Sequence, residues 1–476
     1  MKTNYRQPHV VILPFPAQGH IKPMFMLGKL LCNTGINVTL VNTDQNHNIL
    51  SSSIDKSSFY HLYPGFRFMA LGVGPPEENI RRRGKAEIMK WIISTCHPKF
   101  NELMIEENKG DGKITCVIAD GYMSFAIDVA KEFDIPVISF RTYNATCTWL
   151  YFHLEELLQS GEIPVQDRDM DQQVTCIPGL ENIVRRRDLP EFCRHESGNS
   201  ILQFYMDQTS KMKQASALIL NTFEELESPI VSNLRSIFQK VYTIGPLQGL
   251  LESRMAQNSR WSDVSDASLR PQDQTCISWL DNQAPKSVIY ISFGSLVVLT
   301  RDQLMEFWHG LVNSGLPFLW VIRPGLIMSD TQTPPERSDW PNKRGFIVDW
   351  APQEEVLAHR AIGGFLSHGG WNSTLESIWA GKSMICWPQF ADQQVNSRCV
   401  EEMWRIGLDM KDTCDKSTVE KMVKDLMDST NEQIQKSTAR FASMAHNSVS
   451  KGGSSYRNIE KLIADIKVGC FNKPNT

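Results

Sequence analysis

The sequence predicts an α/β protein with two parallel-sheet domains. Its 476 residues exceed the length of most single domains, and 41% hydrophobic and 21% charged residues are ordinary values for a globular chain. Short apolar runs alternate with segments of helical periodicity, which is typical of strands joined by helices in a parallel sheet. The alternation stops at a polar stretch beyond the middle of the chain and then begins again. We therefore expect two similar domains.

The first half contains short β-rich runs separated by helical patterns. The strand candidates are residues 9–13, 37–42, 115–119, 136–140 and 217–221. Parallel strands that are buried on both faces have nearly continuous apolar sequences, and these runs have that composition. Residues 1–248 are therefore predicted to form the first domain.

Residues 249–275 lose periodicity and become rich in Ser, Gln, Asp and Arg, which predicts an exposed linker. A second series of strands follows, with helices expected at 301–313 and 417–427. Its strand candidates are residues 287–291, 317–322, 345–348, 361–366 and 383–386. The second domain is expected over residues 276–454, and a last helix near 455–476 is expected to pack back on the first domain.

Composition and charge argue against several classes of partner. A net charge of -4 and an isoelectric point near 6.3 disfavour nucleic acid and anionic membranes. The arginine runs at 81–83 and 185–187 are short and isolated, so they are interpreted as solvated faces or loop anchors. The amino-terminal segment lacks the apolar stretch of a signal peptide, and no segment approaches the length of a membrane span. Eleven scattered cysteines without a CxxC pair indicate reduced thiols, so we expect a cytoplasmic protein.

One segment of the second half is typical of an anion site. The apolar run 361–366 suits a buried strand, and His368 follows it with two glycines. Asn372 and Ser373 then offer short polar side chains beside the exposed amides of a helix start, a place that attracts phosphate. In open α/β sheets ligands bind at the carboxyl ends of strands, so two such domains would make a cleft between their strand ends. The alternative for this segment alone is an ordinary capped helix after an ordinary strand.

Three other short motifs resemble known binding sites but are not interpreted as such. Residues 72–74 read GVG but are followed by two prolines and no third glycine, which excludes a dinucleotide fingerprint. Residues 381–383 read GKS, but Glu376 stands where a P-loop needs its first glycine. The acidic run 167–171 lies in a polar loop far from any predicted strand end and is interpreted as a solvated charge run. No metal site is predicted.

The strongest resemblance to a known family lies in residues 350–393, which read WAPQEEVLAHRAIGGFLSHGGWNSTLESIWAGKSMICWPQFADQ. This stretch closely resembles the signature box of plant secondary-metabolite glycosyltransferases, the family that transfers glucose from UDP-glucose to small lipophilic molecules. Further matches are PxPAQGHxxP near the amino end, IPGL at 177–180, RDLP at 187–190, NTFEELE at 221–227, SWLD at 278–281 and VIYISFGS at 288–295. The resemblance implies the GT-B fold, in which two facing Rossmann-like domains enclose an interdomain cleft. Gly369 departs from the pattern, because most relatives have cysteine there.

The resemblance also implies how the donor substrate UDP-glucose would be bound, without a metal or a separate cofactor. The residues that would contact UDP are Trp350 and Gln353 at the uracil, Glu376 at the ribose, and Ser295, His368, Asn372 and Ser373 at the diphosphate. The residues that would contact the sugar are Trp371, Asp392 and Gln393 in the second domain and Thr142 in the first. Glycines, a helix amino terminus and His368 would then take the place of a metal ion as UDP departs.

The resemblance makes His20 the expected general base and Asp120 its partner. A neutral imidazole can remove a proton from an acceptor hydroxyl near pH 7, and a carboxylate can orient the ring and stabilise its charged form. The acceptor oxygen would attack the anomeric carbon opposite UDP in one displacement, so an α-linked donor would give a β-glucoside. The alternatives are a structural loop histidine at position 20 and a helix cap at position 120.

The acceptor is less legible, because its pocket would be formed by loops around residues 75–95, 140–155 and 180–205. The stretches NHNILSS and YPGFRF are most like the plant group that includes 7-deoxyloganetic acid glucosyltransferases. We therefore expect glucosylation of a hydroxyl or carboxyl of an iridoid or other terpenoid, with a phenolic or flavonoid acceptor as the alternative. The chain is expected to act as a monomer.

Two other function classes share parts of this pattern. A two-domain nicotinamide oxidoreductase would have the same architecture but would need the glycine fingerprint. A sugar-nucleotide-binding protein without catalysis would not need the pair of His20 and Asp120. Transfer of glucose from UDP-glucose to an acceptor would distinguish the three classes.

Overall fold

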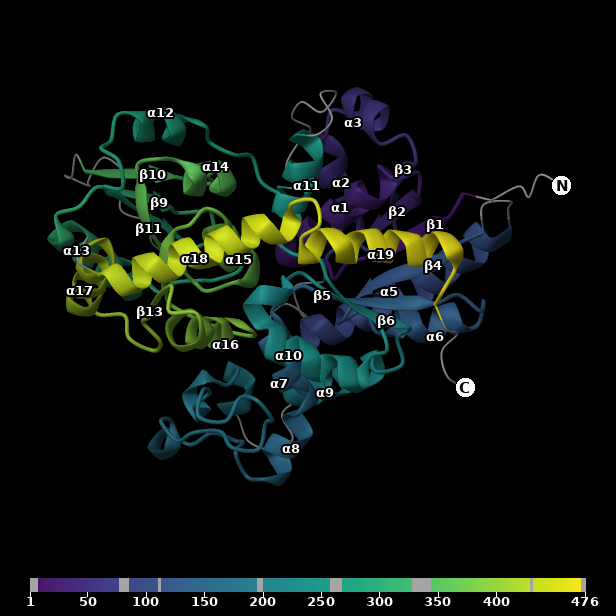
Figure 1. Cartoon of the computed structure of the whole chain (residues 1–476), viewed down its shortest axis with the longest axis horizontal. Helices are drawn as coiled ribbons and strands as arrows, with labels where there is room; N and C mark the ends of the chain where they lie inside the picture. The colour runs from purple at the N-terminus through teal and green to yellow at the C-terminus, as the bar shows by residue number, and fades with distance from the viewer. Residues whose placement is uncertain are drawn as a thin grey trace. The chain divides into compact units, whose positions relative to one another are not determined.

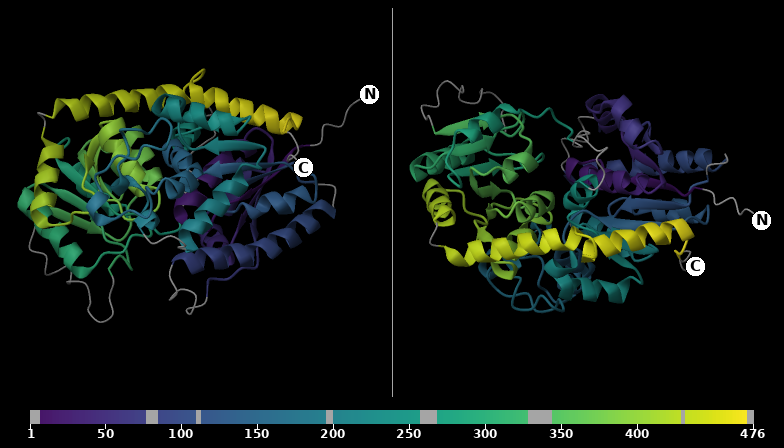
Figure 2. Two further views of the ribbon diagram at one scale, coloured as in Figure 1. Left: turned by 90° about the horizontal axis from the view of Figure 1, so that it is seen from below. Right: turned by 45° about the horizontal axis from the view of Figure 1, so that its top comes forward.

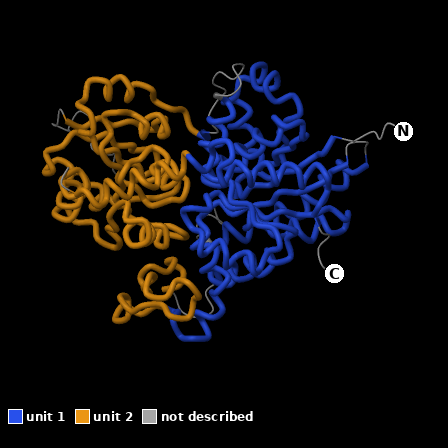
Figure 3. The backbone as a smooth tube through the Cα atoms, in the orientation of Figure 1, with its two compact units in different colours: residues 1–164, 195–269, 447–476 blue, residues 165–194, 270–446 orange. Residues whose placement is uncertain are grey.

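The structure is a computed structural model that describes residues 7–76, 85–109, 113–194, 200–256, 268–327, 344–428 and 431–471. The chain divides into two compact units (Figure 3). Unit 1 comprises Met1–Pro164, His195–Leu269 and Asn447–Thr476, and unit 2 comprises Val165–Arg194 and Arg270–His446. Each unit is built on a parallel β-sheet with helices around it (Figure 1).

The sheet of unit 1 has seven parallel strands in the order β3-β2-β1-β4-β5-β6-β7. The strands are β1 (His9–Leu13), β2 (Asn37–Asn42), β3 (Phe66–Ala70), β4 (Cys116–Asp120), β5 (Val137–Arg141), β6 (Ala217–Leu220) and β7 (Val241–Thr243). The helices are α1 (Gln18–Cys32), α2 (Asp44–Ser53), α3 (Lys56–Leu62), α5 (Lys85–Lys109), α6 (Phe125–Lys131), α7 (Ala145–Phe152), α8 (Leu154–Gln159), α9 (Ser200–Met212), α10 (Glu224–Ile237), α11 (Leu247–Ala256) and α19 (Ser454–Val468).

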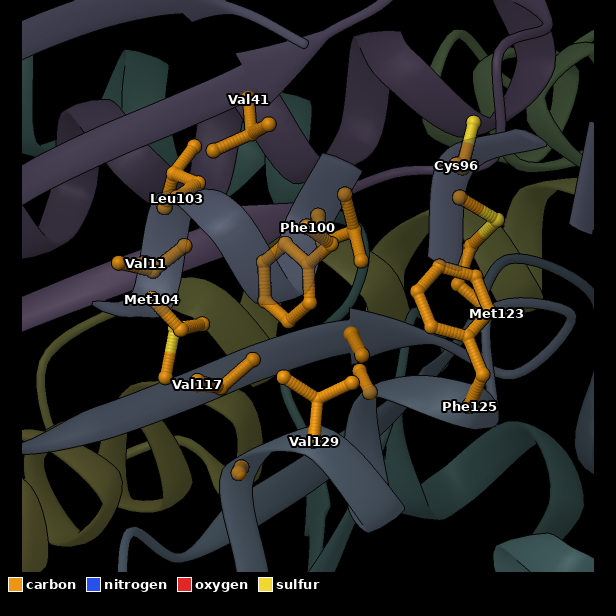
Figure 4. Close-up of a cluster of buried hydrophobic side chains, with 14 of the residues drawn as sticks. Val11, Val41, Cys96, Phe100, Leu103, Met104, Val117, Met123, Phe125 and Val129 are labelled. Carbon is orange, nitrogen blue, oxygen red and sulfur yellow. The ribbon is translucent and has the colours of Figure 1, made fainter. Parts of the chain in front are cut away.

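Helices cover both faces of this sheet, which explains why β1, β4 and β5 are buried along their whole length. On one face Phe100 of α5 packs with Val11, Val117 and Val129 in a buried apolar cluster (Figure 4). On the other face α1 approaches β1 so closely that a Cβ at Gly28 would lie 3.3 Å from the side chain of Ile12. Because adjacent strands are parallel, the residues at their carboxyl ends lie at the same edge of the sheet.

The helix α19 is the last helix that the structure describes, and it belongs to unit 1. It lies against β7 and α10 (Figure 2). Asn458 donates to the hydroxyl of Thr243 at 2.8 Å, and Lys240 pairs with Asp465 at 3.0 Å. These long-range contacts attach α19 to the edge of the first sheet.

The sheet of unit 2 has six parallel strands in the order β10-β9-β8-β11-β12-β13. The strands are β8 (Val288–Ser292), β9 (Phe318–Val321), β10 (Gly345–Val348), β11 (Ile362–Ser367), β12 (Ser383–Cys386) and β13 (Gly407–Asp409). The helices are α12 (Thr275–Asp281), α13 (Arg301–Ser314), α14 (Gln353–Ala358), α15 (Trp371–Trp379), α16 (Gln393–Arg398) and α17 (Lys416–Met427), with short 3-10 turns η1 (Asp167–Asp169), η2 (Arg186–Asp188) and η3 (Glu191–Arg194) and the π-helical turn η5 (Cys399–Met403). The long helix α18 (Glu432–Val449) runs from unit 2 to the first residues of the last segment of unit 1.

All ten strands that the sequence predicts are present, each within one residue of its predicted ends. The helices predicted at 301–313 and 417–427 correspond to α13 and α17. The structure adds β3, β7 and β13, which are edge strands or only three residues long and so give a weak pattern. The helix α11 covers the beginning of the stretch predicted as a linker, and residues 257–267 lie outside the described part of the chain.

Candidate active site

His20 and Asp120 meet at the carboxyl edge of the first sheet. Asp120 is the last residue of β4, and His20 lies in the first turn of α1, which follows β1. The strands β1 and β4 are parallel neighbours, with Leu13 paired with Ala119, so both residues lie at the same edge of the sheet. The Nδ1 atom of His20 lies 2.7 Å from Oδ2 of Asp120, whose side chain is only 2% exposed. The second carboxylate oxygen accepts from the backbone N–H of Tyr122 at 2.9 Å, which fixes the carboxylate. An Nδ1–H that donates to Asp120 leaves Nε2 of the neutral ring free to accept a proton.

Thr142 joins the same pair. It follows β5, which is the next strand of the sheet, and its Oγ1 lies 3.0 Å from Nδ1 of His20. The structure therefore places Thr142 beside the imidazole, on the side where Asp120 contacts the ring. Its predicted contact with the sugar stays a prediction.

Aromatic rings surround this pair in unit 1. The centroids of Phe15 and Tyr122 lie 5.2 Å and 5.5 Å from that of His20. Arg141 is buried, stacks over Tyr122 and Tyr143 at 5.4 Å and 4.9 Å, and donates to Thr209 at 3.1 Å. Burial raises the pKa of Tyr122 and that of Tyr143 well above the ordinary value, so both phenols stay protonated. The surroundings of His20 are therefore mainly aromatic, and the polar groups among these rings are the buried Arg141 and the tyrosine hydroxyls.

The predicted diphosphate segment forms a turn between β11 and α15. His368 follows β11, Gly369 has φ +73°, and Gly370 is the N-cap of α15, so the amides of Asn372 and Ser373 lie in the first helical turn. A helix start of this kind presents N–H groups and positive potential to an anion. Geometry and polarity therefore suit a phosphate group.

The imidazole of His368 lies between two glycines. A Cβ at Gly294 would come within 2.6 Å of its Cε1 and Nε2 atoms, and a Cβ at Gly370 would also collide with Nε2. Ser295 directly follows Gly294, after β8, which pairs with β11. Burial lowers the pKa of His368 to about 4; the nearby charge of Arg323 adds to this effect, and a hydrogen bond to the backbone of Ser292 opposes it. The ring is therefore neutral at pH 7 and carries a single N–H.

Arg323 supplies a buried cation behind the same turn. Its Nε donates to the carbonyl of Gly294 at 3.0 Å, and Nη2 donates to the carbonyl of Val297. Burial lowers the pKa of Arg323 to about 10, so the guanidinium remains charged at pH 7. It organises the residues around Ser295 and adds positive potential close to the helix start.

The residues predicted for the nucleoside also come together in unit 2. The Nε2 of Gln353 donates to Glu376 Oε2 at 2.6 Å and to Ser373 Oγ at 2.9 Å. Trp350 lies just before this group in the chain, and the guanidinium of Arg270 lies 5.6 Å from its ring. The carboxylate of Glu376 is thus held in place with capacity for further donors such as ribose hydroxyls.

Two of the residues predicted for the sugar, Asp392 and Gln393, lie in a second turn, which ends at the start of α16. Gln393 Oε1 accepts from the N–H groups of Gln389 at 2.9 Å and Phe390 at 3.2 Å. Asp392 Oδ2 accepts from Asn396 Nδ2 at 2.6 Å, and the same Nδ2 donates to the carbonyl of Gly369 at 2.8 Å. The sugar turn is therefore tied directly to the diphosphate turn.

Trp371, which is predicted to contact the sugar, has a buried side chain. Its side chain is only 3% exposed and its ring lies 5.9 Å from that of Trp404. The backbone N–H at the start of α15 is then the group of Trp371 best placed for a ligand. Its predicted sugar contact stays a prediction.

The acidic run 167–171 pairs with the arginine run 185–187. Arg187 contacts Asp171 at 2.8 Å, and Arg186 contacts Asp169 at 3.4 Å. Among the described residues, no group of three or more His, Cys, Asp or Glu side chains could hold a metal ion. The arginine run 81–83 lies outside the described residues. None of the helices that the structure describes combines the length and the hydropathy of a membrane-spanning segment.

Comparison with known proteins decides the family. The family model for UDP-glucoronosyl and UDP-glucosyl transferases matches residues 78–448. The chain belongs to this transferase family. The match includes the turns around His368 and Gln393 and the end of β4, so most of the predicted site residues lie within it.

Three similar proteins place this transferase among plant enzymes. The 7-deoxyloganetic acid glucosyltransferase of Catharanthus roseus is 45% identical over 469 residues, which cover 97% of each chain. The myricetin 3-O-rhamnoside 1,2-glucosyltransferase of Crocosmia x crocosmiiflora is 40% identical over 96% of each chain. The solved structure of Medicago truncatula UGT71G1 with UDP-glucose is 30% identical, with a TM-score of 0.82 over 98% of this chain and 100% of that one.

The predicted family and the predicted GT-B fold are confirmed by these matches and by the two parallel sheets. Within the transferase, the sequence did not single out Arg323. One signal was present, since an arginine directly follows the apolar run 317–322. Nothing in that run showed that its side chain turns back to the carbonyl of Gly294, because the contact depends on the neighbouring strand.

Proposed function

We propose that this transferase moves glucose from UDP-glucose to a hydroxyl or carboxyl of a small lipophilic plant metabolite, with inversion at the anomeric carbon. The observation that carries the proposal is the 2.7 Å contact between His20 and Asp120 at the carboxyl ends of neighbouring strands. A protein that only bound a sugar nucleotide would have no need of an oriented base.

The acceptor hydroxyl would give its proton to Nε2 of His20 as its oxygen attacks the anomeric carbon. The Asp120 carboxylate would then stabilise the imidazolium, since it already contacts Nδ1. The carbon–oxygen bond to UDP breaks on the opposite face, so an α-linked donor gives a β-glucoside and UDP. A carboxyl acceptor is already ionised near pH 7 and would not need this base.

Unit 2 would bind the donor and stabilise the charge that develops on UDP. The amides at the start of α15 and the buried Arg323 guanidinium provide the donors and positive potential of such a site, and the neutral ring of His368 lies beside them. The expected absence of a metal requirement follows from this arrangement.

Activity is expected to survive exhaustive treatment with EDTA. The phosphate charge would be met by protein donors, and the acidic run 167–171 is already paired with arginines. The measurement is glucosyl transfer before and after chelation, with and without added Mg²⁺ or Mn²⁺. Loss of transfer that only a divalent metal restores would contradict this part of the proposal.

We infer an iridoid or other terpenoid acceptor, because the relative with 45% identity is named for 7-deoxyloganetic acid. A phenolic acceptor is the second candidate, favoured by the 40% identical relative named for a myricetin glycoside. Purified protein with UDP-glucose should be tested against matched iridoid, terpenoid and phenolic panels, with mass detection of glucosides and of released UDP. Binding of UDP-glucose without any glucoside product would instead favour a non-catalytic role. Monomeric state and cytoplasmic location stay predictions.

Gln393 is expected to select glucose over galactose, which differ only at the 4-hydroxyl. Its Oε1 already closes the sugar turn, so its Nε2 is the donor offered to the sugar. An axial hydroxyl would leave a partner unpaired at a cost of about 1–3 kcal/mol, or roughly a tenfold to hundredfold preference for UDP-glucose.

Two variants test the two groups of the Gln393 carboxamide. Gln393→Ala removes the oxygen that accepts within the turn and the N–H group offered to the sugar, whereas Gln393→Glu keeps an acceptor for the turn and removes only the N–H donor. Both should reduce glucosyl transfer far more than UDP affinity, while exposed Gln435→Ala on α18 should change neither. Wild-type kinetics of both Gln393 variants with UDP-glucose would exclude the assigned role.

A further inference from the structure

A segment from the first half of the chain is built into unit 2. Residues 165–194 cluster with the strands and helices of residues 270–446 (Figure 3). Asp188 is fully buried and pairs with Lys411 at 2.8 Å, and Arg398 Nε donates to the carbonyl of Ile183 at 2.7 Å. Arg194 pairs with Asp412 at 3.1 Å. These contacts fix both ends of the stretch 183–194 to α16 and to the residues around β13.

The same segment reaches the sugar turn through Glu191. Its Oε2 accepts from the backbone N–H of Ala391 at 2.6 Å, across 200 residues of sequence. Ala391 has φ +56°, a left-handed conformation that residues other than glycine adopt rarely. A hydrogen bond from an N–H group to a carboxylate is stronger than one between neutral groups and can hold such a residue in place.

Ala391 directly precedes Asp392 and Gln393, so its conformation sets the direction of both side chains. The carboxamide oxygen of Gln393 accepts from the backbone N–H groups of Gln389 and Phe390 in this turn. The carboxylate of Glu191 accepts from the backbone N–H of Ala391 in the same turn. The two side-chain oxygens therefore hold successive parts of the turn.

We propose that Glu191 is a positioning residue for the donor sugar. It touches no substrate atom in this assignment, and it acts by holding Ala391 so that Asp392 and Gln393 meet the 3- and 4-hydroxyls. The inference rests on the proposed function, because it takes these two residues as the sugar contacts. Its consequence is that the stretch after the RDLP motif contributes to the choice of sugar.

The test compares Glu191→Ala with Glu191→Gln, whose carboxamide oxygen can still accept from Ala391. The matched control is Glu181→Ala, because Glu181 is an exposed glutamate of the same segment that accepts from the N–H of Gly179 at 2.7 Å. For each protein we would measure kcat and KM with UDP-glucose and UDP-galactose, and the Kd of UDP and of UDP-glucose by calorimetry. UDP binding also reports whether each variant is folded.

Glu191→Ala is expected to lower kcat/KM for UDP-glucose about tenfold and to reduce the preference over UDP-galactose, with the Kd of UDP nearly unchanged. Glu191→Gln should retain most of the wild-type kcat/KM for UDP-glucose and most of the preference over UDP-galactose. Glu181→Ala should match the wild type in both quantities. Unchanged sugar preference in a folded Glu191→Ala, or an equal loss of UDP affinity, would overturn the inference. If the wild type transfers no glucose, the proposed function fails. The inference about Glu191 is then tested by binding alone: Glu191→Ala should raise the Kd of UDP-glucose more than the Kd of UDP.

Discussion

Replacing His20 with Ala is expected to lower turnover with a hydroxyl acceptor by about 10²- to 10⁴-fold, the usual contribution of a positioned general base. The reason is the loss of the only group that the proposal assigns to accept the hydroxyl proton. UDP affinity should stay nearly unchanged, because the nucleotide residues lie in unit 2 and His20 lies in unit 1. Steady-state kinetics and UDP calorimetry on the same preparation would test both statements.

Further variants show whether His20 acts as a base with Asp120. Asp120→Asn should reduce turnover in the same direction but less, and the double variant should lose less than the product of the two losses, because the residues act as a unit. Exposed His61→Ala on α3 is the control. A carboxyl acceptor should be much less sensitive to His20→Ala, since it carries no proton to remove. Wild-type turnover of His20→Ala with an alcohol acceptor would refute the assignment.

His368→Ala is expected to lower kcat/KM for UDP-glucose by about 10²- to 10³-fold, the typical effect of removing one polar group from a site that stabilises developing charge. Because the pKa of His368 is lowered to about 4, the free enzyme holds it neutral throughout the range from pH 6 to pH 8. The ratio of wild-type to variant kcat/KM should therefore be constant across that range.

The control for His368 is His309→Ala, which alters an exposed histidine on α13 of the same unit. It should leave kcat/KM at the wild-type value. A ratio for His368→Ala that rises steeply below pH 7 would mean that the ring acts as a cation, contrary to its lowered pKa. An effect of His368→Ala no larger than that of His309→Ala would remove it from the site.

The sequence predicted the central strands because their apolar runs are continuous and the helices between them are amphipathic. It also predicted the two site turns, since His368 and Gln393 lie in a contiguous stretch that resembles the family box. Once β1 and β4 are neighbours, the meeting of His20 with Asp120 follows from the topology of the sheet. Such features depend on local pattern or on strand order.

Other features depend on contacts that no local pattern encodes. The burial of Asp188 against Lys411 places the stretch 183–194 in unit 2, although these two residues are 223 positions apart in number. The position of Thr142 beside His20 depends on the order of β4 and β5, and the bonds of Arg323 to Gly294 and Val297 depend on β8 and β9 being adjacent. These side chains acquire their roles only when the sheets are assembled.

The configuration of the glucoside product would show whether the enzyme transfers glucose with inversion. Purified protein would be given UDP-glucose and the best acceptor from the panels, and the isolated glucoside would be examined by proton NMR while released UDP is quantified. We expect a β-glucoside formed in equal amount to UDP, and at most about one hundredth as much from His20→Ala on the same time scale when the acceptor is an alcohol. An α-glucoside, or UDP released without any glucoside, would contradict this expectation.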